Sequence, residues 1–564
     1  MIKAVISLAE KIKIIIKIPD QNKMIQIECL EEESIMEAIL RHGVYVPAEC
    51  GGRGACGKCK IRLIDGELPI TRQDKMLFNE AWLRQGYRLS CKAHPKKECT
   101  IELAYESNSQ IFVVSENALD KSKINLDTSN AEIDKYGEID KYTEIGTNTD
   151  TTQILPAARL ENSFGIAVDL GTTTIAISLI GMQSGRIYKT YTKENPQRRY
   201  GADVITRMEA SNKGKLIELR DCVRRGIIEG IIILITEEEV SINHIEKIVI
   251  AGNTTMSHLF MGYSCETLGS FPFTPVNIEM IQMNMTDIFS TKDYQVNIDI
   301  PEIPNIPVIL LPGISTFVGG DIVAGLMVCG FLSSEKPWLL IDIGTNGEMA
   351  LGTKEDILVT STAAGPAFEG GNITCGVSSI PGAISHVTLK GDEIHYETID
   401  EKPPIGICGT GVIDLTSELW KEGIIDNTGL LINPYFHEGY RITDLTFLQK
   451  DIREIQLAKA AIRAGIEILI SRYGISYDQI DQVYLAGGFG YKIDIQKAIH
   501  IGLLPKELSG KIKAVGNSSL AGAIKYLTDS KAKEDVEKLR TISREIHLSN
   551  DEEFNELYIN YMSF

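Results

Sequence analysis

Apolar and polar residues alternate along two runs near the N-terminus, Lys11–Ile18 and Met24–Cys29. Alternation with a period of two is typical of strands with one buried face, and the polar turn cluster between the runs predicts a hairpin. Ser34 followed by Glu37 is a capping-box pattern, which predicts that a short helix begins there. A third alternating run, Cys99–Leu103, predicts another strand. We therefore expect a small mixed α+β domain over the first hundred residues.

From residue 165 onward the pattern becomes α/β. The apolar run Ile166–Leu170 leads into a Gly/Thr turn at residues 171–174, and the run Leu339–Ile343 leads into a similar turn at residues 344–347. Two further apolar runs, Val249–Ala251 and Tyr484–Ala486, are each followed by glycine. The second half of this region repeats the order of the first, so we predict a duplication over about residues 165–528.

Small residues mark another matching pair of segments, Gly319–Gly325 and Gly516–Ala523. Because the distance between packed helices depends on the side chains at their contact, these segments predict two helices that cross closely at a hinge.

The region over residues 107–162 differs from both of these parts. A polar tandem hexad, Glu132–Gly137 followed by Glu138–Thr143, has no clear core face. We interpret residues 107–162 as a flexible or thinly structured linker, with a small intermediate domain as the alternative. The predicted organisation is a domain over 1–106, this linker, two lobes over 163–335 and 336–528, and a tail over 529–564 that packs on the lobes.

The composition narrows the class of protein. Hydrophobic residues make up 43% and charged residues 24%, as in soluble globular proteins. The net charge of −19 argues against nucleic-acid binding. No apolar run approaches the roughly 18 to 20 residues of a membrane span, and charge interrupts the N-terminus too early for a secretory signal. We predict a cytoplasmic protein with no nucleic-acid or membrane partner.

Four of the 11 cysteines are spaced like metal ligands: Cys50, Cys56, Cys59 and Cys91. Glycine and alanine between the first three let the backbone wrap closely around a cluster. The spacing predicts one [2Fe–2S] cluster held by four thiolates. Zinc is the alternative metal, although only one short Cys-x-x-Cys knuckle is present. Cys99 is the alternative fourth ligand, and we prefer Cys91 because Cys99 opens a predicted strand.

Both halves of the chain resemble known families. Hairpin, helix and Cys-rich loop resemble the β-grasp ferredoxins, and five residues between Cys50 and Cys56 make the loop similar to the adrenodoxin-like branch. The duplicated region resembles the actin, sugar kinase and Hsp70 superfamily, in which two lobes close over ATP. The resemblance implies a two-lobe α/β ATPase preceded by an α+β ferredoxin domain.

The second resemblance implies an ATP and Mg²⁺ site. Asp169 and Asp342, each near a strand end, are the candidate catalytic residues, which hold Mg²⁺ or orient a water. The candidate phosphate-binding residues lie in the two turns: Gly171, Thr172, Thr173, Thr174, Gly344, Thr345 and Asn346. Gly487, Gly488 and Phe489 are expected to contact the nucleoside. Gly409 and Thr410 belong to a further Gly-rich turn that is expected along the cleft.

A ferredoxin domain fused to such an ATPase resembles the reductive activators of corrinoid-dependent enzymes, including O-demethylase activators. Three further segments fit this resemblance, residues 195–197, 200–204 and 451–460. It implies ATP-dependent, one-electron reduction of a corrinoid protein, a methyltransferase component, from Co(II) to Co(I). It further implies an upstream electron donor and an anaerobic metabolism, and a homodimer stays open as the oligomeric state.

Three alternative functions remain. One is an ATP-coupled electron donor to another low-potential metalloenzyme. The second is a plain ferredoxin-type electron-transfer module with a non-catalytic docking domain, and the third is a small-molecule kinase with an attached redox sensor.

Overall fold

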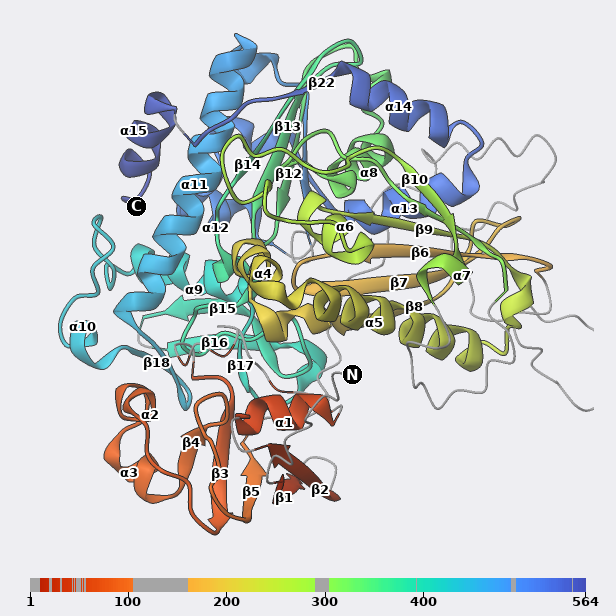
Figure 1. Cartoon of the computed structure of the whole chain (residues 1–564). Coiled ribbons are helices and arrows are strands. Elements are labelled where there is room, and N and C mark those ends of the chain that lie inside the picture. The colour runs from red at the N-terminus through yellow and green to blue at the C-terminus, as the bar shows by residue number, and fades with distance from the viewer. Residues whose placement is uncertain are drawn as a thin grey trace, which may run out of the picture.

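The computed structural model of the chain (Figure 1) describes residues 11–19, 23–30, 33–42, 44, 46, 52, 54, 57–104, 161–289, 304–391, 393–487, 493–549 and 551–564. Most of the predicted linker lies outside the described residues, and so do Cys50, Cys56, Gly488 and Phe489. Within the described ranges, no helix combines the length and the apolar character needed to cross a membrane.

The N-terminal domain is a five-stranded mixed sheet in the order β2-β1-β5-β3-β4. Its elements are β1 Lys11–Ile18, β2 Lys23–Leu30, α1 Ile35–Arg41, β3 Lys60–Asp65, α2 Arg72–Leu77, α3 Glu80–Arg84, β4 Tyr87–Leu89 and β5 Cys99–Leu103. The predicted hairpin is confirmed by the antiparallel pairing of β1 with β2, and the capping box of Ser34 and Glu37 begins α1 as expected. The parallel pairing of β1 with β5 completes a β-grasp arrangement.

The next part of the chain forms the first lobe. Its elements are β6 Phe164–Leu170, β7 Thr174–Gly181, β8 Ile187–Glu194, α4 Val204–Ala210, α5 Leu216–Glu237, β9 Ile245–Gly252, α6 Thr254–Met261, β10 Ile281–Asn284, α7 Met285–Ile288, β11 Pro307–Leu310 and α8 Gly320–Cys329. Glu161, assigned from the sequence to the end of the linker, is buried and accepts hydrogen bonds from Gln183 N and Ser184 Oγ, both at 2.7 Å.

The second lobe follows directly. Its elements are β12 Trp338–Ile343, β13 Gly347–Gly352, β14 Ile357–Thr362, β15 Ala383–Lys390, β16 Glu393–Thr398, β17 Gly406–Ile407, α9 Gly409–Lys421, α10 Tyr435–Glu438, β18 Tyr440–Ile442, β19 Leu445–Phe447, α11 Gln449–Tyr473, β20 Gln482–Ala486, α12 Ile495–His500, β21 Ile512–Gly516 and α13 Ser518–Thr528. After it come α14 Ala532–Ile542, β22 Ser543–Glu545 and α15 Glu552–Asn560.

The two lobes share the order and direction of five strands, which confirms the predicted duplication. The first sheet has the order β10-β11-β9-β6-β7-β8 and the second β21-β20-β12-β13-β14-β22. In each sheet an antiparallel meander, β6-β7-β8 or β12-β13-β14, is extended by parallel strands, β9 and β11 or β20 and β21. The carboxyl ends of the central strands β6 and β12 therefore lie at equivalent places in the two lobes.

Helices α8 and α13 join the lobes at the predicted close crossing. A Cβ at Gly325 would lie 2.9 Å from Ser518 Oγ, and one at Gly522 would overlap Ala324. One buried apolar cluster contains side chains from α8, α13 and both sheets, including Val249 and Leu340. Glycine and alanine are thus required here because larger side chains would force the helices apart.

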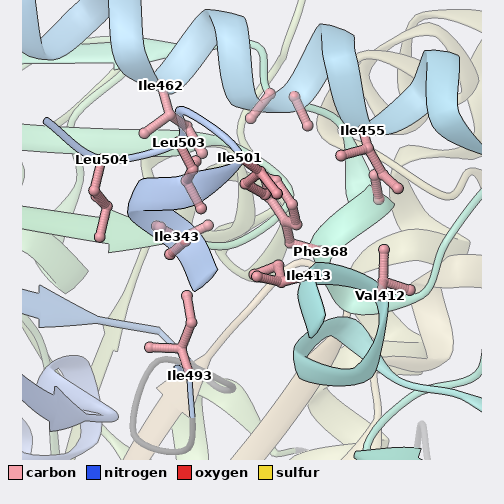
Figure 2. Close-up of a cluster of buried hydrophobic side chains, with 14 of the residues drawn as sticks. Ile343, Phe368, Val412, Ile413, Ile455, Ile462, Ile493, Ile501, Leu503 and Leu504 are labelled. Carbon is pink, nitrogen blue, oxygen red and sulfur yellow. The ribbon is translucent and has the colours of Figure 1, made fainter. Parts of the chain in front are cut away.

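A second buried cluster gives the second lobe its own core. Figure 2 shows Phe368 packed among Ile413 of α9, Ile455 and Ile462 of α11, and the residues after α12. Since Phe368 also lines the cleft between the lobes, this core fixes the position of one cleft wall.

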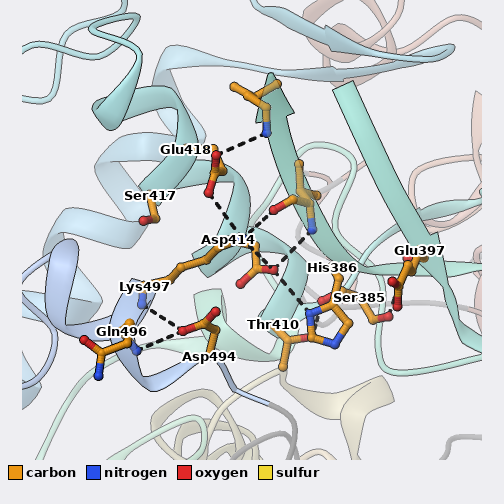
Figure 3. A network of polar contacts seen from close by, with 12 residues as sticks. Ser385, His386, Glu397, Thr410, Asp414, Ser417, Glu418, Asp494, Gln496 and Lys497 are labelled. Atoms are coloured by element: carbon orange, nitrogen blue, oxygen red, sulfur yellow. Dashed lines mark hydrogen bonds and ion pairs between the residues drawn. The ribbon is translucent and has the colours of Figure 1, made fainter. Parts of the chain in front are cut away.

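A polar network fastens α12 to the same lobe (Figure 3). Lys497 Nζ lies 3.1 Å from Asp414 Oδ2 and 3.4 Å from Glu418 Oε1, and it donates to Val387 O at 2.5 Å. The Asp414 and Glu418 side chains are buried on α9, 2% and 7% exposed. The Nδ1 atom of the neighbouring His386 lies 3.3 Å from Asp414 Oδ2, and this contact raises the pKa of the imidazole.

We expect Lys497→Met to destabilise α12, because it removes the cation that two buried carboxylates share. Loss of one partner from a buried ion pair costs about 3 kcal/mol or more. Hydrogen exchange of the α12 amides should then be on the order of 100-fold faster than in the wild type. Lys506→Met, at an exposed lysine, is the control. Equal protection in the two variants would show that the network contributes nothing to stability.

Candidate functional site

Two matching turns face each other between the lobes. In the first lobe Gly171 N donates to Thr174 O at 3.0 Å, and in the second Gly344 N donates to Asn346 O at 2.9 Å. A Cβ at Gly171 would lie only 2.6 Å from Thr174 O, so this tight turn needs glycine. The hydroxyl oxygens of Thr173 and Thr345 approach to 3.2 Å across the gap. The turns therefore direct two hydroxyl groups at one place, as phosphate-binding turns do.

Buried side chains of the first lobe support its turn from behind. Asn195 Nδ2 donates to Gly171 O at 2.8 Å, and Arg207 Nη2 donates to Thr172 O at 2.6 Å. Burial lowers the pKa of Arg207 to about 9. Both residues are fully buried, so their role is to hold the turn in place. The sequence marked the segment around Asn195 only through its resemblance to a family.

The turns open into a cleft of about 1000 Å³, a volume that includes space open to solvent. Most of the predicted ATP-site residues line it: Asp169, Gly171, Thr172, Thr173, Thr174, Asp342, Gly344, Thr345, Asn346 and Gly487. Gly487, with φ +116°, donates from its N–H to Gly516 O at 3.1 Å.

Gly409 and Thr410 are not among the residues that line this cleft. Gly409 is the first residue of α9 and lies close to Phe368 O. Any side chain at position 409 would overlap this oxygen. The Thr410 hydroxyl is buried and donates to Ser385 O at 2.8 Å. This Gly-Thr-Gly turn is therefore used for packing, which differs from the expectation.

Carboxyl groups crowd the floor of the cleft. Asp169 accepts from Asn517 Nδ2 at 2.8 Å and from Ser519 Oγ at 2.7 Å. Asp342 lies beside Ser518 Oγ at 3.5 Å. Both aspartates touch the cleft on one side and protein on the others, and this removal from water raises their pKa values.

Burial and the charges of Asp321 and Asp169 raise the pKa of Asp342 to about 8. Burial and the Asp169 charge raise that of Asp321 to about 7, and burial also raises the pKa of Glu348. So many carboxyls in one small space favour bound protons or a bound cation. Among the described residues, however, no three His, Cys, Asp or Glu side chains are arranged to hold a metal ion by themselves.

Glu369 links the two turns. Its Oε2 accepts a hydrogen bond from Thr173 Oγ1 at 3.0 Å and another from Thr345 Oγ1 at 2.6 Å. In the sequence, Glu369 stands in a glycine-rich turn, Gly365–Gly370, that could line such a cleft. Other cleft residues that the sequence did not assign to the site are Asn253, Asp321, Ser378, Ser379, Asn517 and Ser519. Asp321 lies in the segment Gly319–Gly325, and Asn517 and Ser519 lie in Gly516–Ala523. The internal repeat of these two segments was the sequence feature that could have indicated them as site residues.

Two of the four predicted cluster ligands lie in the described part of the N-terminal domain. Cys59 directly precedes β3 and Cys91 follows β4, and the strands pair with Lys60 opposite Leu89. This pairing brings Cys59 and Cys91 to the same end of the β3–β4 hairpin, where both are buried. Gly52, Gly54 and Gly57 all have φ between +72° and +78°, which suits a loop that wraps around a cluster. The chemistry of the donors thus fits an iron–sulfur cluster.

Cys99 lies elsewhere in the domain. It opens β5 as predicted and is buried beside Gly66, and burial raises its pKa to about 11.

Family comparisons cover nearly all of the described chain. Residues 18–96 match a 2Fe-2S iron-sulfur cluster binding domain. Residues 164–334 match the RACo middle region, and residues 336–564 match the C-terminal domain of RACo, described as its ASKHA domain.

Relatives extend this match over most of the chain. The corrinoid activation enzyme RamQ of Eubacterium limosum is 32% identical over 70% of this chain and 69% of its own length. The [Co(II) methylated amine-specific corrinoid protein] reductase of Methanosarcina barkeri is 27% identical over 71% of this chain and 77% of its own. The solved structure of a reductive activator for corrinoid, iron–sulfur protein covers 98% of both chains with 29% identity and a TM-score of 0.65. From its two phosphate-type turns, its ferredoxin-type domain and these relatives, we conclude that the chain belongs to the RACo family of reductive activators of corrinoid proteins.

Proposed function

We propose that this protein uses ATP to drive the one-electron reduction of a corrinoid protein from Co(II) to Co(I). The observation that carries the proposal is the meeting of the two turns, with the Thr173 and Thr345 hydroxyl oxygens 3.2 Å apart, in a chain that also has a 2Fe-2S domain. The names of its relatives, a corrinoid activation enzyme and a Co(II) corrinoid protein reductase, support the choice of partner. That partner is the corrinoid component of a methyltransferase.

On the ATP side, the two turns bind phosphate oxygens through their hydroxyl and N–H groups. Asp169 and Asp342 hold Mg²⁺ or orient the attacking water. Because no three described side chains converge as metal ligands, we assign Mg²⁺ to one or two carboxylates together with phosphate oxygens, its usual arrangement. Gly487, Gly488 and Phe489 contact the nucleoside.

On the redox side, Cys50, Cys56, Cys59 and Cys91 hold the cluster. When bound, a [2Fe–2S] cluster of the plant type supplies one electron near about −400 mV. The Co(II)/Co(I) couple lies lower, and each 59 mV of shortfall costs about a factor of ten in the equilibrium. ATP offsets this cost if its bound state favours a corrinoid conformation that is easier to reduce. An upstream donor must then return the electron to the N-terminal domain.

The central test mixes the reduced protein with a Co(II) corrinoid protein and follows Co(I) absorbance. We expect Co(I) to appear only with Mg-ATP, and we expect Thr173→Val to slow its formation about tenfold because a phosphate donor is lost. Thr388→Val, at an exposed position of β15, should keep the wild-type rate. Co(I) formation at one rate with and without Mg-ATP would contradict the proposal.

The choice of fourth cluster ligand has its own test. Cys91→Ser should lose the visible absorbance and most of the iron, normally about two per chain. Cys99→Ser, a matched change in the same domain, should retain both because Cys99 belongs to the core of β5. Iron loss in Cys99→Ser with retention in Cys91→Ser would reverse the assignment.

Asp342→Asn should abolish ATP hydrolysis and at the same time raise the Tm at pH 8. The pKa of Asp342 rises from an ordinary 3.8 to about 8 in the native protein. The native state therefore holds this proton more tightly than the unfolded chain, and the carboxyl lowers stability as pH rises from about 4 to about 8. An amide does not ionise, so the gain in Tm should be largest at pH 8 and fall toward zero near pH 4.

Phosphate release and calorimetry at several pH values measure the two effects. Asp444→Asn, at an exposed turn, is the control and should change neither. Wild-type ATPase activity in Asp342→Asn would overturn our placement of the second phosphate turn.

A further inference from the structure

The Glu369 carboxylate occupies the place where the two phosphate turns meet. Its Oε2 accepts hydrogen bonds from both threonine hydroxyls, Thr173 at 3.0 Å and Thr345 at 2.6 Å. A nucleotide phosphate held by these hydroxyls would be a second anion at the same donors. Because like charges repel strongly in a site removed from water, phosphate and the Glu369 carboxylate compete for them.

Glu369 ends a short 3₁₀ turn, Pro366–Glu369, and is followed by residues 370–376, here called the connecting segment. This segment is folded tightly on itself. Gly371 N donates to Pro366 O at 2.9 Å, Gly376 N donates to Ile373 O at 3.0 Å, and a Cβ at Gly376 would overlap Gly370 O. Displacement of Glu369 and Gly370 must therefore also displace Gly376.

The connecting segment is also tied to the cleft and to α11. Ser378 and Ser379, which follow shortly after Gly376 in the sequence, line the cleft. Thr374 donates to Asp451 Oδ1 from its N–H at 2.7 Å and from its hydroxyl at 2.8 Å. Both ends of the segment thus lie next to the nucleotide site, while its middle is fixed to the long helix.

The outer face of the connecting segment contacts the N-terminal domain. Lys58 Nζ donates to Gly376 O at 2.6 Å. Lys58 directly precedes the predicted ligand Cys59, so this contact fixes the cluster-binding loop against the second lobe. Figure 1 shows the N-terminal domain beneath the sheet β16-β15-β17, to which residue 376 is joined by a bridge to Ile407.

We propose that Glu369 and Lys58 are positioning residues that link the nucleotide site to the docking of the cluster domain. In the absence of nucleotide, Glu369 ties the turns together and the connecting segment holds Lys58. Phosphate displaces Glu369, the segment shifts, and the Lys58–Gly376 contact breaks, which frees the cluster domain to face its redox partner. The inference rests on the proposed function, since it needs phosphate at the two turns.

Thermodynamic linkage makes this proposal testable from either end. If nucleotide weakens the Lys58 contact, then removal of the contact must tighten nucleotide binding by the same factor. We expect Lys58→Met to bind Mg²⁺ with the non-hydrolysable analogue AMPPNP at least fivefold more tightly than the wild type, as measured by calorimetry on the full, cluster-loaded chain. Lys75→Met, at an exposed lysine of α2, is the matched control and should leave the affinity unchanged.

Glu369→Gln tests the competing anion. Loss of its charge should also tighten Mg-AMPPNP binding at least fivefold, whereas Glu422→Gln, at the exposed end of α9, should not. Because both substitutions act on one linked equilibrium, Lys58→Met should add less than twofold in the Glu369→Gln background. In the wild type, Mg-AMPPNP should speed hydrogen exchange of the amides at 374–377.

Equal affinity in Lys58→Met and Lys75→Met would overturn the coupling, and weaker binding in Glu369→Gln would show that Glu369 helps to bind nucleotide. Iron content confirms that each variant keeps its cluster. The two failures can be told apart, because failure of the proposed function would appear as Co(I) formation without ATP or as no binding of Mg-AMPPNP by the wild type, whereas failure of the coupling leaves both of these as expected.

Discussion

The close crossing of α8 and α13 is the constraint on which the cleft depends. Gly325 and Gly522 let the two helices touch, and the apolar cluster around them joins both sheets into one packed unit. The start of α13 lies between the lobes, where Asn517 and Ser519 bind Asp169 of the first lobe and Ser518 lies beside Asp342 of the second. A single helix terminus therefore positions the carboxyl groups of both halves. Any side chain that widened the crossing would separate the two turns as well.

Much of the fold could be predicted because its signals are local. Strand alternation placed β1 and β5, and the capping box placed the start of α1, since each depends on neighbours in sequence. The duplication could also be predicted, because the same order of motifs in two halves requires the same topology. Within the site, the turns at Gly171 and Gly344 could be found because a tight turn leaves few choices of residue.

The remaining site residues depend on contacts between distant segments, which no single sequence reports. Glu369 looks like any acidic residue in a glycine-rich turn until folding places it between Thr173 and Thr345. At Gly409 and Thr410 the composition of the turn and its packing point in different directions. Their Gly-Thr-Gly turn has the composition of a phosphate turn, yet its glycine serves the approach of Phe368 O. Composition describes what a turn can do, and only the packing around it decides which use is made of it.

The pairing of β22 with β14 has a consequence for biosynthesis. β22 comes from residues 543–545, so the edge of the second sheet is covered only by a segment that is translated late. The strands of the first sheet all end by residue 310, so they can pair while the chain is still being made. Until the late segments emerge, Asp169 also lacks Asn517 and Ser519, and the edge of β14 is open to pairing with other chains. A nascent chain on the ribosome thus has the strands of its first sheet before it has the completed cleft, and during this interval an open strand edge exposes it to aggregation.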